Sequence, residues 1–99
     1  MTLRPMARED LRAIARGIEA DSVVNAARFM VKVLKAIEGL RVLPNGRSLA
    51  RESPAFGYPI RQTVVKPYRI IFMVEADSVR VLRVYHSARS ILGPIELWS

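Results

Sequence analysis

The 99-residue sequence contains no cysteine and a single histidine, His86. Without thiols the chain has no disulfides, no zinc–thiolate or iron–sulfur sites and no cysteine nucleophile. One imidazole also leaves too few ligands for an ordinary zinc site. We therefore expect no metal or other cofactor.

Long hydrophobic runs are missing as well. The longest, residues 70–74, has five residues, whereas a membrane-spanning helix needs about 20. Residues 1–8 have no apolar segment of the kind that marks a signal peptide. We therefore expect a cytoplasmic protein that does not contact a membrane.

Acidic residues are few, with 9 Asp+Glu against 16 Lys+Arg and a formal charge of +7. Thirteen of the 16 basic residues are arginine, whose guanidinium pairs well with carboxylates and phosphates. A GC-rich genome also favours arginine codons, and both explanations stay open. Between residues 39 and 74, six basic residues stand against one acid. Much of the excess charge therefore lies in the middle of the chain.

Hydrophobic residues make up 51% of the sequence, which is typical of a packed globule, and the length suits a single domain over residues 1–99. Residues 2–4 favour a short edge strand before Pro5. Residues 7–20 place Leu11, Ile14 and Ile18 on one face of a helix.

A second helix is predicted after Asp21 and Ser22, because both residue types cap helix N-termini. It must end before Pro44, and the short connection to the first helix predicts an antiparallel hairpin. The expected buried stripe is Val23, Ala27, Met30, Leu34 and Ile37, widened by Ala26, Val33 and Leu40. The opposite face carries Asn25, Arg28, Lys32 and Lys35.

A polar loop at residues 47–59 separates the helices from a β-rich half, where the apolar period changes from about 3.6 residues to about 2. Strands are predicted at residues 60–65, 68–75 and 79–86, the last two joined by a hairpin turn. The middle strand is apolar on both sides and should be central. Residues 90–99 are expected to form a C-terminal tail whose apolar end packs back or binds a partner.

These elements predict an α+β fold, with the N-terminal helical hairpin packed on one face of a three- to four-stranded antiparallel sheet. The other face of the sheet is expected to be partly open.

The order of these elements, with several local patterns, resembles the RelE/ParE superfamily of bacterial toxin–antitoxin toxins. Residues 3–14 resemble the family's opening strand and first helix, and residues 68–74 and 81–89 resemble its last two strands. The second helix and the turn after it are similar at Ala27, Arg28, Phe29, Ile37, Leu40, Pro44, Gly46 and Arg47.

The resemblance implies a toxin held inactive in a hetero-oligomer with a cognate acidic antitoxin. RelE-like members cleave messenger RNA on the ribosome, whereas ParE-like members poison DNA gyrase. The RelE-type scheme uses Lys and Arg on the middle strands with a Tyr, His or Arg near the C-terminus. The nuclease candidates here are Arg61, Arg69, His86 and Arg89, with Tyr85 behind them, and the RelE-type lysines are missing.

Arginine stays protonated and is a poor base, so His86 is the one side chain suited to proton transfer near neutral pH. Alternation predicts that it shares a face with Leu82 and Val84, which favours a structural role at a strand end. Arg69 is expected to anchor the sheet or to pair with an acid such as Glu75 or Asp77.

Residues 86–89 resemble the ParE-type ending, and a binding poison needs no acid–base pair. We therefore favour a ParE-like gyrase inhibitor that is not an enzyme, with a ribosome-dependent mRNA endoribonuclease and a basic RNA-binding module as alternatives. The rows of cations on the two helices are interpreted as solvated faces. The residues expected to contact the target or the antitoxin are Arg47, Arg51, Arg61, Lys66, Arg69, Arg89 and Trp98.

Overall fold

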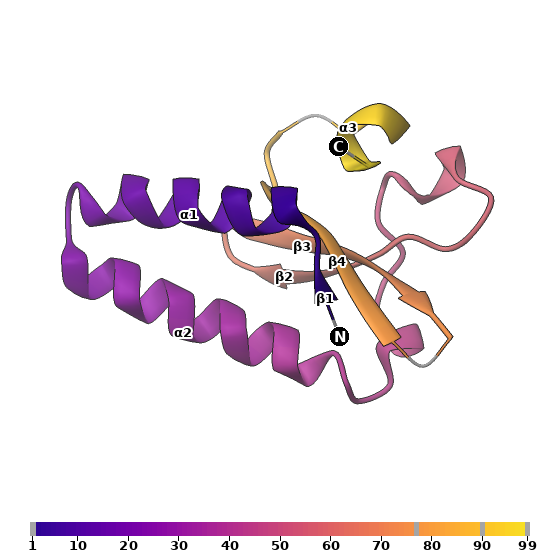
Figure 1. The fold of residues 1–99 in the computed structure, drawn as a ribbon, viewed down its shortest axis with the longest axis horizontal. Coiled ribbons are helices and arrows are strands. Elements are labelled where there is room, and N and C mark those ends of the chain that lie inside the picture. The colour runs from indigo at the N-terminus through magenta and orange to yellow at the C-terminus, as the bar shows by residue number, and fades with distance from the viewer. Residues whose placement is uncertain (1, 77, 90, 99) are drawn as a thin grey trace.

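The computed structural model describes residues 2–76, 78–89 and 91–98, without the side chains of Ile95 and Trp98. Within these residues a helical hairpin covers one face of a four-stranded sheet, and a loop and a short C-terminal helix lie on the other face (Figure 1). None of the described helices is long and apolar enough to cross a membrane. The elements are β1 (Thr2–Leu3), α1 (Pro5–Glu19), α2 (Val23–Gly39), β2 (Arg61–Val65), β3 (Tyr68–Glu75), β4 (Ser78–His86) and α3 (Pro94–Trp98), with 3-10 turns at Pro44–Gly46 and Ser53–Ala55.

Both predicted helices are present, and local chemistry explains where they begin. Helix α1 starts at Pro5, whose fixed φ and missing N–H suit the first helical turn. Helix α2 is capped by Ser22, whose Oγ accepts a hydrogen bond from the Asn25 N–H at 3.1 Å. The connection between the helices is therefore short, and the two pack as the predicted antiparallel hairpin.

Ile37 and the widening residues Ala26, Val33 and Leu40 are buried as predicted, but part of the predicted stripe on α2 is exposed. Val23 and Leu34 are 68% and 56% exposed, and Ala27 is exposed as well. The helix carries apolar residues on several sides, so the pattern alone is satisfied by more than one face. The bulky Phe29 is buried and packs edge-on against Tyr68 with ring centroids 5.3 Å apart. The residues that α2 buries are Ala26, Phe29, Val33 and Ile37, followed by Leu40 at its C-cap.

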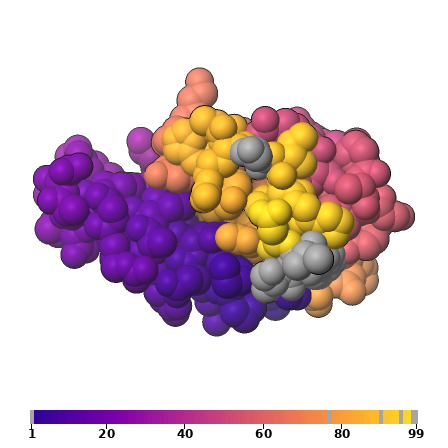
Figure 2. Space-filling model, turned by 90° about the horizontal axis from the view of Figure 1, so that it is seen from above, coloured from indigo at the N-terminus to yellow at the C-terminus, as the bar shows by residue number. Residues whose placement is uncertain are grey.

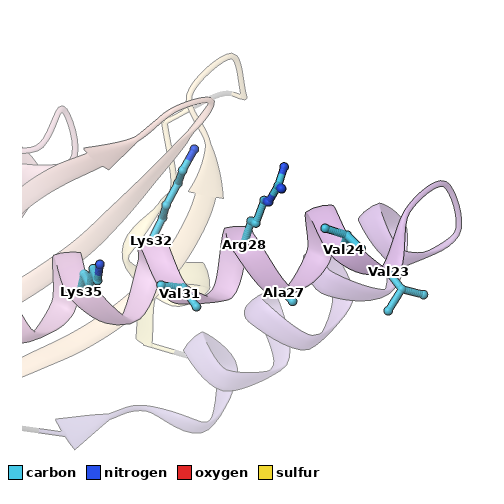
Figure 3. Close-up of a pocket in the computed structure, with 7 residues that line it drawn as sticks. All are labelled: Val23, Val24, Ala27, Arg28, Val31, Lys32 and Lys35. Carbon is cyan, nitrogen blue, oxygen red and sulfur yellow. The ribbon is translucent and has the colours of Figure 1, made fainter.

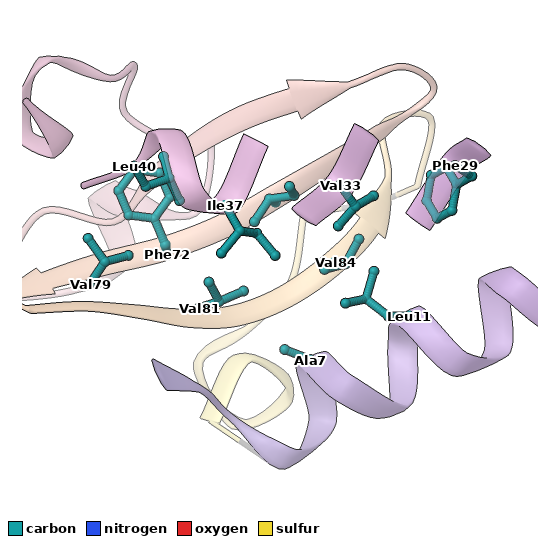
Figure 4. Packing of buried hydrophobic residues seen from close by; sticks show 11 residues of the cluster. Ala7, Leu11, Phe29, Val33, Ile37, Leu40, Phe72, Val79, Val81 and Val84 are labelled. Carbon is teal, nitrogen blue, oxygen red and sulfur yellow. The ribbon is translucent and has the colours of Figure 1, made fainter. Parts of the chain in front are cut away.

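The first core lies between the hairpin and the sheet. Figure 4 shows Ala7 and Leu11 of α1 and Ile37 of α2 around Val81 and Val84 of β4. Because both helices contribute to this cluster, both are anchored to the sheet.

The sheet is mixed, whereas an antiparallel one was predicted. Its order is β1-β4-β3-β2, and β3 pairs antiparallel with both β2 and β4. The N-terminal β1 pairs parallel with β4, with Leu3 beside Val81. A parallel neighbour is possible because the long connection through the helices, β2 and β3 separates the two strands in sequence. The α+β class and the predicted edge position of residues 2–3 are confirmed.

A β-bulge in β4 changes which residues share a face. Ile71 pairs with Arg83 while the next residue, Phe72, pairs with Val81, so Leu82 is an extra residue on the bulged strand. Leu82 therefore belongs to the second core, while Val84 belongs to the first. The prediction that Leu82 and Val84 share a face is wrong, because simple alternation does not count the extra residue.

The second face of the sheet is covered, which corrects the expectation of a partly open face. Ile71, Met73 and Leu82 of the strands pack there with side chains from the 47–59 loop region and from the C-terminal segment. Leu92 and Leu97 are 2% and 0% exposed, so the predicted tail packs back onto the sheet. In Figure 2 this yellow segment lies between the indigo α1 and the pink loop. The side chain of Trp98, predicted as a contact residue, lies outside the described residues.

Candidate functional site

A buried ion pair between Glu52 and Arg69 connects the loop to the central strand. The Arg69 Nη1 and Nη2 atoms donate to Oε1 and Oε2 of Glu52 at 2.7 and 2.6 Å, and both residues are 1% exposed. The Leu92 N–H also donates to Glu52 Oε2 at 2.9 Å. Burial alone raises the pKa of Glu52, but the hydrogen bonds from Arg69 and Leu92 and the charge of Arg69 outweigh it and hold the pKa below its usual value.

This pairing removes Arg69 from the molecular surface. Its interior position corrects the prediction of Arg69 as a contact residue and as a nuclease candidate. The expected role as a sheet anchor agrees with the structure, but the acid is Glu52. Glu75 pairs with Arg80 at 3.2 Å instead, and Asp77 lies outside the described residues.

A second ion pair connects β4 to α1, and the same arginine also reaches α3. The Arg83 Nε and Nη2 atoms donate to Asp10 at 2.7 and 2.9 Å, and Arg83 Nη1 donates to the Glu96 carbonyl at 2.9 Å. Asp10 also accepts the Val84 N–H at 3.0 Å. The hydrogen bonds to Asp10, partly opposed by burial, raise the pKa of Arg83. The carboxylate of Asp10 is therefore already occupied in a structural role.

The C-terminal end of β4 gathers cations from distant parts of the chain. Arg51 reaches from the loop and donates from Nη2 to the Ser87 carbonyl at 2.9 Å. The Arg89 guanidinium lies over the Tyr85 ring, 4.4 Å from its centroid. We name the set Arg51, Tyr85 and Arg89 the β4-end cluster. An arginine stacked on a ring keeps its N–H edges available for a carboxylate or a phosphate.

The remaining predicted cations fall into two places. Lys66 is exposed in the β2–β3 turn, at the same end of the sheet as the β4-end cluster, because the Ser87 N–H donates to the Pro67 carbonyl at 2.8 Å. Arg47 and Arg61 lie at the start of β2 instead. Arg61 donates to the Arg47 carbonyl at 2.8 Å, and Arg47 donates to the Gly39 carbonyl at 3.3 Å. The structure thus brings Arg51, Lys66 and Arg89 to one end and leaves Arg47 and Arg61 apart.

The ring of His86 makes two local contacts at the end of β4. Its Nδ1 accepts a hydrogen bond from the Ala88 N–H at 3.0 Å, so in the neutral ring Nε2 carries the proton. Nδ1, the basic nitrogen of that neutral ring, is thus already hydrogen-bonded to the backbone. The ring also packs edge-on against Tyr68 with centroids 5.4 Å apart. The geometry agrees with the predicted structural role at the strand end.

A small cavity of about 130 Å³ lies beside His86 and includes Asp10, Tyr68 and Arg89 in its lining. It offers the Arg89 guanidinium and aromatic rings, and Asp10, the carboxylate among its lining residues, is held by Arg83. Within the part of the chain that the structure describes, no group of three or more His, Cys, Asp or Glu is placed to hold a metal ion. The arrangement is chemically suited to binding an anionic or polar surface.

Sequence reasoning missed three features of this half of the molecule: the carboxylates of Glu52 and Asp10 and the stacking of Arg89 on Tyr85. The one available signal for Glu52 was its position as the single acid between residues 39 and 74. A lone carboxylate among many arginines is a natural ion-pair partner.

A helical hairpin on one face of a four-stranded sheet is the arrangement that the resemblance to the RelE/ParE toxins implies. The family model described as "ParE toxin of type II toxin-antitoxin system, parDE" matches residues 2–91. The chain therefore belongs to the ParE toxin family.

One solved structure supports the same fold. It is described as the chromosomal ParDE TA system from P. aeruginosa, and it superposes with a TM-score of 0.70 at 19% identity, over 86% of this chain and 91% of that chain. The comparison with curated proteins finds no match.

Proposed function

We propose that this ParE-family toxin inhibits DNA gyrase by binding it, and that a cognate acidic antitoxin neutralises the toxin in a hetero-oligomer. The observation that supports binding over catalysis is the hydrogen bond from the Ala88 N–H to His86 Nδ1. It engages the nitrogen of the protein's one imidazole that would serve as a base, while Asp10 is held by Arg83. Gyrase inhibition by binding needs neither group.

The β4-end cluster, together with Lys66, is the proposed contact surface for the target. Arg89 is exposed and stacked on Tyr85, and Arg51 is exposed while one of its nitrogens is anchored to Ser87. Each guanidinium has five N–H donors, so the anchored arginine retains several for a partner. Anchored arginines lose less side-chain entropy on binding than free ones. Arg47 and Arg61 extend the proposed contacts at the start of β2.

The proposal is tested with purified toxin in a gyrase supercoiling assay. Wild-type toxin is expected to inhibit supercoiling or to trap cleaved DNA, and Arg89→Ala is expected to weaken inhibition about tenfold, since arginine contacts commonly dominate interfaces. Arg8→Ala serves as the matched control, because Arg8 is also exposed but lies on α1.

Unchanged gyrase activity at excess wild-type toxin contradicts the proposal. Cleavage of ribosome-bound messenger RNA by the wild type, with loss of cleavage in His86→Gln, points instead to the endoribonuclease alternative. Neutralisation is tested with the product of the gene next to that of the toxin: if the toxin is paired with an antitoxin there, an acidic protein from that gene is expected to restore supercoiling.

A further inference from the structure

The outer edge of β2 is only partly covered by the rest of the chain. Residues 48–50 pair with residues 60–62, where the Gln62 N–H donates to the Ser48 carbonyl at 2.9 Å. Backbone groups alternate between the two sides of a strand, so the N–H and the carbonyl of Val64 point to the same side as those of Gln62. Among the described residues, none pairs with the Val64 backbone on that side.

The neighbouring loop does not continue this pairing because its backbone turns away. A continued strand would place Gly46 opposite Val64, as Leu49 stands opposite Arg61. Residues Pro44–Gly46 instead form a 3-10 turn, in which the Gly46 N–H donates to the Leu43 carbonyl at 2.9 Å. The Val64 side chain is 50% exposed at this edge. The divergence opens a cavity of about 300 Å³ between the loop and β2, lined by Gly46, Arg47, Ser48, Gln62, Thr63 and Val64.

This edge, residues 62–65, which we name the β2 free edge, runs between two groups of cations. Arg47 lines the cavity at one end, and the exposed Lys66 follows at the other end, towards the β4-end cluster. The strand from Arg61 to Lys66 is about 17 Å long, so the cations are spread along its whole length. None of the described residues that line the cavity is acidic. The β2 free edge therefore presents unused backbone groups among positive charges.

We propose that an extended acidic segment of DNA gyrase adds to β2 at its free edge, which rests on the proposed inhibition of gyrase by this toxin. The segment accepts a hydrogen bond from the Val64 N–H and donates one to the Val64 carbonyl, as a fifth strand of the sheet. Its carboxylates meet Arg47 and Lys66. In this mode of recognition, main-chain hydrogen bonds supply the affinity and the neighbouring side chains supply the specificity. The added strand joins the cations at the start of β2 and those near the β4-end cluster into one contact surface.

Other occupants satisfy only part of this edge. The phosphates of DNA accept hydrogen bonds but donate none, so they leave the Val64 carbonyl without a donor. A second copy of the chain, paired edge to edge, would bring Arg61 and Lys66 close to the same cations of the other copy, which is repulsive. An acidic protein segment supplies both the backbone groups and the opposite charge.

The test measures inhibition of purified gyrase holoenzyme by toxin variants in the supercoiling assay. Val64→Pro removes the Val64 N–H, and proline is tolerated at a sheet edge where that N–H faces outward. This variant is expected to raise the toxin concentration for half-inhibition at least about tenfold, because a carbonyl of the added segment is left without its donor. Circular dichroism verifies that the variant folds.

Two further variants isolate the role of the backbone. Val64→Ala retains the N–H and is expected to change the half-inhibiting concentration less than about threefold. Val24 is 58% exposed and lies in a separate groove on α2 (Figure 3). Val24→Ala therefore controls for the loss of an exposed valine and is expected to leave inhibition unchanged.

Hydrogen exchange of the Val64 amide tests the same contact without a substitution. In the toxin alone this amide is expected to exchange quickly, and in the toxin–gyrase complex its exchange is expected to slow at least about tenfold. A contact made through side chains alone leaves the exchange rate nearly unchanged. This measurement decides the question if Val64→Pro does not fold.

The outcomes separate this inference from the proposed function. If wild-type toxin does not inhibit gyrase, the proposed function and this inference both fail. If the wild type inhibits and folded Val64→Pro inhibits equally well, or gyrase leaves the Val64 amide unprotected, only this inference fails. It is also overturned if duplex DNA without gyrase protects the Val64 amide to the same extent, or if Val64→Pro converts a wild-type dimer to a monomer.

Discussion

Replacing Glu52 by glutamine tests the most deeply buried polar contact of the fold. Glu52 accepts two short hydrogen bonds from Arg69 and one from the Leu92 N–H, all in the protein interior. Glutamine has nearly the same shape but retains only one acceptor oxygen. Its amide NH₂ group would replace the other oxygen and face an N–H donor of Arg69 or Leu92. The charge of Arg69 is then left buried without its counter-ion.

Removing one partner of a buried ion pair costs about 3 to 5 kcal/mol. For a domain of this size, that loss lowers the melting temperature by at least about 12 °C, taking 4 °C per kcal/mol as the smallest shift. It also removes much of a typical total stability of about 5 to 15 kcal/mol. The measurement is urea and thermal unfolding of Glu52→Gln beside wild type. Glu38→Gln is the matched control, because it breaks an exposed pair with Arg41 and should leave the melting temperature nearly unchanged.

The pH dependence of the difference in stability between wild type and Glu52→Gln provides an independent check. The pKa of Glu52 is lower in the folded protein than in the unfolded chain, so its ionisation stabilises the fold above its unfolded pKa. That contribution is lost as the pH falls through the folded pKa. The stability gap between wild type and Glu52→Gln is therefore expected to be full at pH 7 and to shrink steadily below about pH 4. A gap that is absent at pH 7, or that does not change with acidification, refutes the reasoning.

Three further predictions concern other parts of the molecule. Leu97→Ala is expected to destabilise the protein by about 2 to 5 kcal/mol, because Leu97 is fully buried in the second core. Urea unfolding measures this loss, and a loss below about 1 kcal/mol would show that α3 does not pack against the sheet. Ser22→Ala is expected to cost about 1 kcal/mol through loss of the N-cap hydrogen bond to Asn25, whereas Ser22→Asp, which retains a capping oxygen, should restore most of it. His86→Gln is expected to leave growth arrest intact on expression without antitoxin, since the imidazole is structural, and loss of toxicity with unchanged folding would contradict this.

Periodicity predicted the elements well but not the faces they bury. The helices and the strands appear close to the predicted residues, because each repeats its apolar positions with the period of its own geometry. The α2 stripe was predicted correctly only in part, since Val23, Ala27 and Leu34 are exposed although they are as apolar as the residues that are buried. Only contacts with Tyr68 and the sheet select the face that contains Phe29.

The second core and its ion pair were beyond the reach of sequence patterns. The apolar residues that cover this face come from a loop and a short C-terminal segment, such as Ala50 and Leu92, which have no repeating spacing. The Glu52–Arg69 pair joins residues 17 positions apart across an irregular loop. Its geometry depends on the path of that loop, which no local rule specifies.

The bulge at Leu82 affects how this chain should be aligned with its relatives. Because Phe72 faces Val81 and Ile71 faces Arg83, taking residue 82 out would leave a regular ladder with the other pairs intact. Leu82 is thus equivalent to a one-residue insertion in an otherwise ordinary strand. A relative without it is expected to show a single gap at this position and to keep the counterparts of Arg83 and His86 on their present sides of the sheet.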